Sequence, residues 1–382
     1  MKTMKKLFFS AVAVLLLAGC ASMQSAAPAP KAYTGKKIKT GFYIDKGSRG
    51  GGVIHLARLL TYSPQIELTL LKGEDLRKGK LNGLDMIVMP GGSSQLQMES
   101  MGPAGVKALQ DFVRKGGLYV GICAGFHITL NRPERAQLMP YTYIREAVGA
   151  RGDVLIELTP EARKMLDVKQ KKYMVRYSRG PVAKAAQWNK GACKTLALYK
   201  SSIGPLNRAG KSFFNTPAMI AGTYGKGKVI ATSFHPEYKL DTYDLFAGCV
   251  YVVSGIKITP QIPVPAYRSL QVAFNTGAAT ARGTEHTIRE TIELERSPLI
   301  KLHTGMNHDA LNTVDVVVLP ETTDAFVQGF IKNDWPKFLK IFMDKGRKVI
   351  AAGPAWGKLP AHKNLIRIPA KASLRKAVEA LY

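Results

Sequence analysis

Short apolar runs alternate with helix-like stretches along the first two thirds of the chain. The runs occupy residues 38–44, 67–71, 86–89 and 118–121. Between the last two, residues 106–113 have apolar side chains three, six and seven positions after the first, the spacing of an amphipathic helix, and Gly116-Gly117 predicts its end. This alternation predicts an α/β fold with a doubly wound parallel sheet, and a site outside the carboxyl ends of its strands.

Cys123 lies in Gly121-Ile122-Cys123-Ala124-Gly125, directly after the last of these runs. A nucleophile at a sharp strand-to-helix turn requires small residues two positions away on either side, as found here. A helix that begins after it would favour the thiolate over the thiol. Taken alone, the pattern favours a small buried cysteine in a Gly-rich turn.

Two distant segments add the groups that such a cysteine needs. His235 and Glu237 follow a β-like run at 228–232, and are suited to accept the thiol proton and to orient the base. Gly91 and Gly92 end the run at 86–89, where glycines allow a close backbone approach and present N–H groups to an oxyanion. Each of these two segments alone fits an ordinary turn or loop. Together with the turn at Cys123, and in this order along the chain, they indicate a Cys-His-Glu site.

With these segments the chain resembles the class I glutamine amidotransferase-like superfamily, whose triad is a Cys followed by His-x-Glu. Within that superfamily it is most similar to proteins that carry the biotin-protein ligase N-terminal domain. The resemblance covers about residues 36–255. It depends on Pro90-Gly91-Gly92, the turn at Cys123, Tyr177-Ser178-Arg179-Gly180-Pro181 and His235-Pro236-Glu237.

The resemblance implies a flavodoxin-like fold and a role for each residue of the site. The implied roles are nucleophile for Cys123, base for His235, orienting group for Glu237, oxyanion hole for Gly91, Gly92 and Ala124, and substrate binding for His127, Tyr177 and Arg179. One position departs from the family. Glutamine-using members tend to have Gln two residues beyond the second elbow glycine, where this chain has His127, so glutamine is not the expected substrate.

The last third of the chain repeats the first in degraded form. Residues 84–90 reappear as 314–320, and 112–116 as 342–346, so that Asp315 and Lys345 follow Asp85 and Lys115 by 230 positions. In this register Gly353 stands for Cys123, and Glu321-Thr322 for the paired glycines. We therefore expect residues 36–258 to form the catalytic domain and 259–382 a second, degenerate flavodoxin-like domain. Chance similarity between two α/β segments is the alternative.

The amino terminus has the pattern of an export signal. Lys2, Lys5 and Lys6 precede an apolar run at 7–17, which is too short for a transmembrane helix. Leu17-Ala18-Gly19-Cys20 resembles the bacterial lipoprotein signal, which implies removal of residues 1–19 and lipidation of Cys20; an ordinary signal peptide is the alternative. Residues 20–35 are predicted to form a flexible tether.

The implied location is the cell envelope, lipid-anchored and facing the periplasm. Ala21, where inner-membrane lipoproteins of enteric bacteria have Asp, favours the outer membrane by analogy. The net charge of +28 remains strongly positive without the three leader lysines. Nucleic acid is therefore not an expected partner, whereas anionic envelope molecules are. Residues 168–236 contain no acid, which indicates either a solvated basic face or a cationic wall beside the site.

Cysteine usage and motifs limit the cofactors. Four cysteines in 382 residues do not form a disulfide framework, and Cys193 and Cys249 are left to pair or to be buried separately. We find no zinc spacing and no Gly-rich phosphate loop, so we expect no metal and no cofactor.

The sequence thus predicts an envelope lipoprotein that hydrolyses an amide or related acyl bond through a thioester on Cys123. The expected ligand is small and anionic or amide-containing. Two alternatives remain: a non-catalytic receptor that uses the same pocket, and a protein that handles biotin or a related carboxamide. The oligomeric state and the substrate do not follow from the sequence.

Overall fold

The computed structural model describes residues 33–48, 51–145, 151–185, 193–202, 213–261, 272–274, 299–301, 315–332 and 335–381. The predicted signal peptide, Cys20 and most of the tether lie outside these ranges. Within them, no helix has the length and apolar character needed to cross a membrane.

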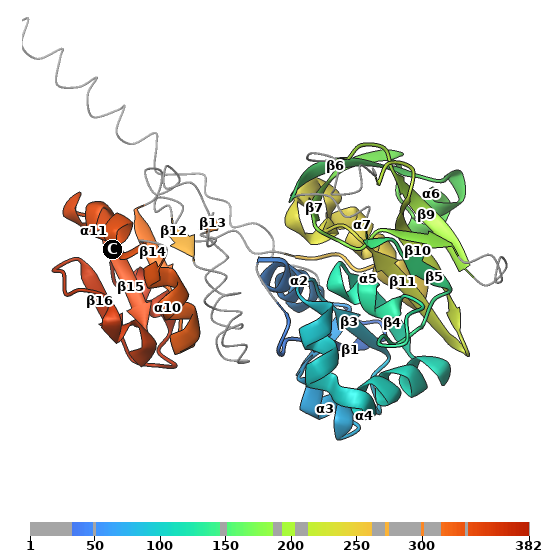
Figure 1. The fold of residues 1–382 in the computed structure, drawn as a ribbon, viewed down its shortest axis with the longest axis horizontal. Helices are drawn as coiled ribbons and strands as arrows, with labels where there is room; N and C mark the ends of the chain where they lie inside the picture. The colour runs from blue at the N-terminus through green and yellow to red at the C-terminus, as the bar shows by residue number, and fades with distance from the viewer. Residues whose placement is uncertain are drawn as a thin grey trace, which may run out of the picture. The chain divides into compact units, whose positions relative to one another are not determined.

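The first sheet has nine strands, of which five are parallel (Figure 1). The parallel strands are ordered β2-β1-β3-β4-β11, the order of the flavodoxin-like fold. The elements of this half are β1 (Ile38–Tyr43), α2 (Gly51–Thr61), β2 (Ile66–Leu71), α3 (Gly73–Arg77), β3 (Met86–Met89), α4 (Ser94–Arg114), β4 (Leu118–Ile122), α5 (Ala124–Thr129), β11 (Gly227–Thr232) and α7 (Tyr243–Ser254).

The other four strands extend the sheet beyond β11 in the order β10-β9-β6-β7, and each pairs antiparallel with its neighbour. A separate ribbon joins β5 to β8. The elements are β5 (Tyr141–Tyr143), β6 (Arg151–Leu158), α6 (Pro160–Leu166), β7 (Lys172–Ser178), β8 (Ala183–Ala185), β9 (Cys193–Tyr199), β10 (Pro217–Tyr224), and the 3-10 turns η2 (Pro236–Tyr238) and η3 (Leu240–Thr242). The sequence did not predict this extension.

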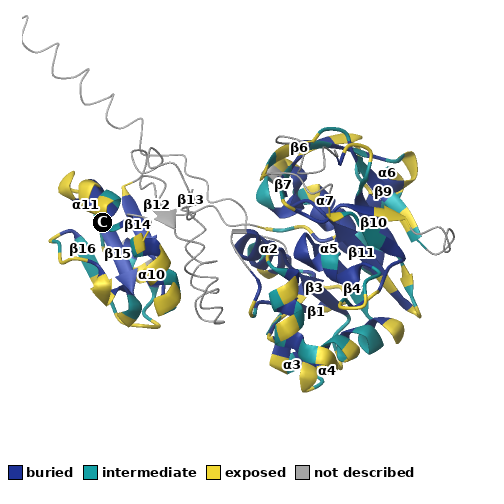
Figure 2. Cartoon of the chain, in the orientation of Figure 1, coloured by how far each residue is buried: buried dark blue, intermediate teal, exposed yellow. Residues whose placement is uncertain are grey.

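Helices cover both faces of the parallel strands because their side chains alternate between two apolar clusters. Val88 and Val120 pack with residues of α2 and α7, whereas Ile87 and Tyr119 pack with residues of α4. The central strands are buried on both sides (Figure 2). This agrees with the near-continuous apolar runs in the sequence and confirms the predicted fold class.

A second sheet has five parallel strands ordered β13-β12-β14-β15-β16, the same order as the parallel half of the first sheet. Its elements are β12 (Val272–Phe274), β13 (Leu299–Lys301), β14 (Val316–Leu319), α10 (Asp324–Lys332), α11 (Trp335–Asp344), β15 (Lys348–Ala352), η5 (Pro354–Lys358), β16 (Leu365–Ile368) and α12 (Leu374–Glu379). β14 and β15 follow β3 and β4 by 230 positions at both ends, as the repeat in the sequence predicts.

The second sheet lacks the groups that the first sheet has at the corresponding turn. Gly353 follows β15 with φ +85°, so a positive φ is kept at this position but the thiol is absent. Glu321 is buried, and its Cγ lies 3.0 Å from the point where a Cβ at Gly353 would stand. The side chain of Glu321 therefore lies where a nucleophile at position 353 would project.

Close contact between β3 and α5 predicts a strict requirement for glycine at position 125. A methyl group there would lie 2.3 Å from the carbonyl oxygen of Met89, so Gly125→Ala should lower the free energy of unfolding by about 2–3 kcal/mol. Gly329→Ala is the matched control, because a methyl group inside α10 meets no described atom within 4 Å. It should raise stability by about 0.5–1 kcal/mol. Denaturant unfolding measures both, and equal effects would contradict the packing described here.

Candidate active site at the carboxyl edge of the first sheet

Cys123 occupies a strained turn between β4 and α5. Its φ of +53° and ψ of −96° are unusual for a residue with a side chain. The backbone is held from three sides. The amide of Cys123 donates to the carbonyl of Thr232 at 2.7 Å, and Cβ atoms at Gly121 and Gly125 would lie 2.7 Å and 2.3 Å from backbone atoms. The thiol thus projects at the carboxyl end of the parallel strands, as the elbow motif predicts.

His235 and Glu237 lie just beyond the adjacent strand, β11. Because β4 and β11 are parallel neighbours, their carboxyl ends meet. His235 lies beside Cys123, since a Cβ at Gly91 would be 2.6 Å from the ring of His235 and 3.4 Å from the Cβ of Cys123. Nδ1 of His235 lies 2.7 Å from Oε1 of Glu237. Glu237 is fully buried, and its Oε2 has no hydrogen-bond partner among the described residues. The structure thus brings together the three residues that the sequence assigns to catalysis.

Two Gly-containing segments approach this trio closely. A Cβ at Gly91 would lie 2.6 Å from Cε1 of His235 and 3.4 Å from Cβ of Cys123. A Cβ at Gly52, in α2, would lie 2.6 Å from Oε1 of Glu237. Gly92 has φ +137° and forms a bridge with Ser48. The segment with Gly91 and Gly92 therefore lies beside Cys123, and Ala124 follows Cys123 at the start of α5.

Electrostatic interactions link His235 to Glu237 and to Cys123. Burial disfavours the charged imidazole of His235, but Glu237, Cys123 and the hydrogen bonds to both outweigh it and raise the pKa of His235 to about 10. His235 is consequently an imidazolium at neutral pH.

The antiparallel extension holds His235 from the other side. The amide of His235 donates to the carbonyl of Arg176 at 2.8 Å, on the edge strand β7. The Ser233 hydroxyl donates to the carbonyl of Pro181 at 2.6 Å, and a Cβ at Gly180 would lie 1.8 Å from the carbonyl oxygen of Ser233. The segment 177–181 thus packs directly against the segment that leads into His235.

Tyr177 and Arg179 differ in what they offer a ligand. Tyr177 is fully buried, its ring stacks on Phe213, and its hydroxyl donates to the carbonyl of Gly180 at 2.8 Å. This geometry gives Tyr177 a structural part in the loop, whereas the sequence assigned it to substrate binding. Arg179 is exposed, in a left-handed conformation with φ +57°. Its contact with a substrate remains a prediction.

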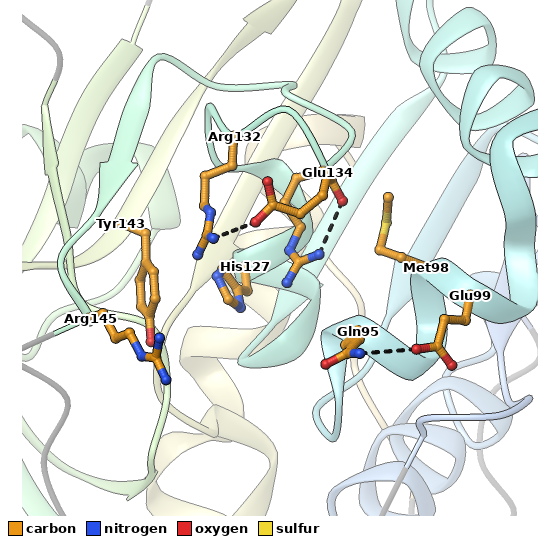
Figure 3. Close-up of a pocket in the computed structure, with 9 residues that line it drawn as sticks. Gln95, Met98, Glu99, His127, Arg132, Glu134, Tyr143 and Arg145 are labelled. Carbon is orange, nitrogen blue, oxygen red and sulfur yellow. Dashed lines mark hydrogen bonds and ion pairs between the residues drawn. The ribbon is translucent and has the colours of Figure 1, made fainter.

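His127 lies one helical turn after Cys123 and lines a cavity of about 580 Å³ (Figure 3). Its amide donates to the carbonyl of Cys123 at 3.1 Å, and its Nδ1 lies 2.9 Å from the Ser94 hydroxyl. Burial first, and then Arg135 and Arg132, lower the pKa of His127 to about 3, so its ring is neutral at pH 7. A neutral imidazole there can donate or accept one hydrogen bond to a ligand.

Cys193 and Cys249 are free thiols, so the pairing left open by the sequence does not occur in this structure. They belong to apolar clusters on opposite faces of the first sheet. Burial raises the pKa of Cys193 to about 11 and raises that of Cys249 further. Neither has the acid-base neighbours that Cys123 has.

Sequence reasoning missed several residues that surround the trio. The Tyr238 ring lies 5.2 Å from that of His235, and its hydroxyl accepts a hydrogen bond from the amide of Gly52 at 3.0 Å. His55 lies 5.0 Å from the same tyrosine ring. Tyr238 directly follows Pro236-Glu237, and a run of three glycines, 50–52, follows the first strand, so both segments could have been considered.

Comparison with protein families agrees with part of the resemblance. The family model described as biotin-protein ligase, N terminal, matches residues 71–134. This segment contains β3, α4, β4, the turn at Cys123 and α5. No curated protein matches the chain. The chain is therefore a flavodoxin-like α/β protein in which residues 71–134 are similar to the N-terminal family of biotin-protein ligases.

Similar solved structures share little sequence with the chain. A protein described as ThuA-like, from Parabacteroides merdae, is 13% identical, with a TM-score of 0.42 over 60% of this chain and 94% of that one. A protein described as ThuA-like from Bacteroides uniformis is 15% identical, with a TM-score of 0.41 over 60% and 98%. A cytoplasmic protein from Salmonella typhimurium is 12% identical, with a TM-score of 0.38 over 56% and 98%. The strand order of the chain itself is the basis for the fold class given above.

The surroundings of the three described cysteines predict which one is alkylated first. Iodoacetamide should label Cys123 before Cys193 and Cys249, because burial raises the pKa of the other two thiols. His235→Gln should slow labelling of Cys123 at least about tenfold. Peptide mapping by mass spectrometry measures each site. Preferential labelling of Cys193 or Cys249, or indifference of Cys123 to His235→Gln, would contradict this view of the site.

Proposed function

We propose that the chain is a cysteine hydrolase of the amidotransferase-like type, which cleaves an amide or related acyl bond through a thioester. The observation that carries the proposal is the continuous contact from Cys123 to His235 and from His235 to Glu237. The Gly91 segment beside them supports it, because it offers backbone N–H groups next to the thiol.

The reaction follows from this arrangement. The Cys123 sulfur, having passed its proton to His235, attacks the acyl carbon, and the carbonyl oxygen becomes an oxyanion that N–H groups of Gly91, Gly92 and Ala124 stabilise. The intermediate collapses, the carbon–nitrogen bond breaks, and His235 gives its proton to the leaving amine. Water, deprotonated by His235, then attacks the thioester, which releases the acid and restores the thiol. Glu237 holds His235 through Nδ1, so that Nε2 serves the sulfur.

A receptor without catalysis is the second candidate. It is favoured by the low exposure of Cys123 and His235, at 6% each, and by His127, which stands where glutamine-using members of the superfamily tend to have Gln. Such a protein would hold an amide-containing ligand in the same pocket without forming a bond to it. Biotin or a related carboxamide is one ligand that the family description suggests, and it belongs in the panel of compounds to be tested.

The hydrolase proposal is tested by adduct formation and turnover. We expect acid-quenched wild-type protein, incubated with N-acyl amino acid p-nitroanilides and biotinamide, to carry an acyl adduct on Cys123 by intact mass and to release product. His235→Ala should lower kcat/KM at least about 10³-fold and Glu237→Gln about 10²–10⁴-fold. Cys193→Ser and Glu321→Gln, the matched controls, should change it less than about twofold. Binding of the same compounds by wild type and Cys123→Ala alike, with no adduct, would favour the receptor.

We further propose that the protein acts in the cell envelope, anchored by lipid on Cys20 and facing the periplasm from the outer membrane. The basic start, the apolar run at 7–17 and Leu17-Ala18-Gly19-Cys20 support this location. The tether at 20–35 would let the folded part stand off the membrane surface.

Replacement of the predicted lipidated cysteine tests the anchor. Cys20→Ser should move the protein from the membrane fraction to the soluble fraction, while its thermal unfolding midpoint stays the same, because the residue precedes the folded part. Ala21→Asp is the companion variant and should redirect the protein to the inner membrane without releasing it. A soluble wild-type protein with an unmodified amino terminus at Cys20 would refute the anchor.

A further inference from the structure

The His127 cavity lies near the elbow, because the amide of His127 donates to the carbonyl of Cys123. Two of its walls come from elements that also build the site: His127 from α5, and residues from the first turns of α4, which begins two residues after Gly92 (Figure 3). The cavity volume of about 580 Å³ is in the range that holds small molecules. The lining consists of Gln95, Met98, Glu99, His127, Arg132, Glu134, Arg135, Tyr143 and Arg145.

Positive charge in this cavity is only partly balanced. Glu134 forms a salt bridge with Arg132, and Glu99 accepts from Gln95 and pairs with Lys46 at 3.4 Å. In the described part of the chain, no carboxylate forms a salt bridge with Arg135 or Arg145. Arg145 therefore has no salt-bridge partner among the described residues, and the only carboxylate that acts on Arg135, that of Glu134, already pairs with Arg132.

Unused hydrogen-bonding groups gather at the same place. Nε of Arg135 and Nε2 of His127 are both buried without a hydrogen-bond partner in the described structure. Buried polar groups are usually satisfied by the protein, by water or by a ligand. Arg135 donates only to the backbone carbonyl of Glu134, at 3.0 Å, so most of its planar fork is available.

Aromatic contacts position the side of the cavity that contains Tyr143 and Arg132. The Tyr143 ring lies 4.5 Å from the His127 ring, and the guanidinium of Arg132 lies 5.3 Å from the centre of the same tyrosine ring. Tyr143 thereby separates His127 from solvent on one side and helps to orient Arg132. Together with Met98, it gives the cavity an apolar surface between its charged groups.

We infer that this cavity is the subsite for an anionic group of the substrate, a carboxylate or a phosphate, bound chiefly by Arg135 and Arg145. Guanidinium forks match the two or three oxygens of such groups. The inference rests on the proposed function, since it places the scissile acyl carbon at Cys123 and the anion one helical turn away, beside His127. It assigns the anion to a different part of the fold from the exposed Arg179.

The test separates binding from catalysis by using Cys123→Ser protein, in which the nucleophile is replaced. N-acetylglycine, inorganic phosphate and the neutral N-acetylglycinamide are titrated and followed by ligand-observed NMR. We expect the two anions to bind at least tenfold more tightly than the neutral amide, and more weakly as ionic strength rises. Arg135→Gln and Arg145→Gln should each weaken anion binding about tenfold. Arg151→Gln, which removes an exposed arginine outside the cavity, should leave it unchanged.

A second measurement links the cavity to the nucleophile. In wild-type protein, N-acetylglycine should slow alkylation of Cys123 at least about threefold at saturation, and Arg145→Gln should abolish this protection. Arg145 is exposed, so its variant will fold even if Arg135→Gln does not. Equal binding of N-acetylglycine and N-acetylglycinamide, loss of binding in Arg179→Gln alone, or no protection of Cys123 would each overturn the inference. Anion binding and protection without any adduct or turnover would instead refute the hydrolase and leave the subsite.

Discussion

The left-handed turn at Cys123 is the constraint on which the site depends. A side chain at φ +53° is unfavourable, and the turn persists because its surroundings leave little alternative. The Thr232 carbonyl binds the amide of Cys123, and the glycines on either side allow α5 to lie against β3 and β4. The same bond joins β4 to β11, whose end carries His235. The strain that directs the thiol outward and the placement of its base thus have one structural cause.

A comparison of the two sheets shows which features of the site come from the turn between strand and helix and which need further strands. The second sheet repeats the strand order and the positive φ at the turn, with Gly353 in place of Cys123 and Glu321 beside it. It has no counterpart of the antiparallel extension among its described strands. In the first sheet that extension holds His235 through the Arg176 carbonyl and packs the 177–181 loop against Ser233. In the first sheet the parallel strands position the Cys123 thiol, and the added strands help to fix His235.

Much of the fold was predictable, because strands buried on both faces leave long apolar runs and because glycines mark the turns that need them. For this reason the strand Met86–Met89 was predicted correctly, and so was the pair of strands that follows β3 and β4 at an offset of 230 positions. The extension was missed because its strands, such as Lys172–Ser178, alternate polar with apolar residues and are separated by loops. Cys123, His235 and Glu237 could be predicted because the chemistry needs those residue types. The arginine cavity could not, since Arg132, Arg135 and Arg145 come together only through the loop that follows α5.

The central claim is that Cys123, His235 and Glu237 form one coupled unit, and the protonation of His235 tests it most directly. An NMR titration of the His235 ring should give a pKa near 10 in the wild-type protein. Because Cys123 and Glu237 are what raise it, Cys123→Ala and Glu237→Gln should each bring the pKa down by at least about one unit. A wild-type pKa near the ordinary value of about 6.5, unchanged in both variants, would contradict the account.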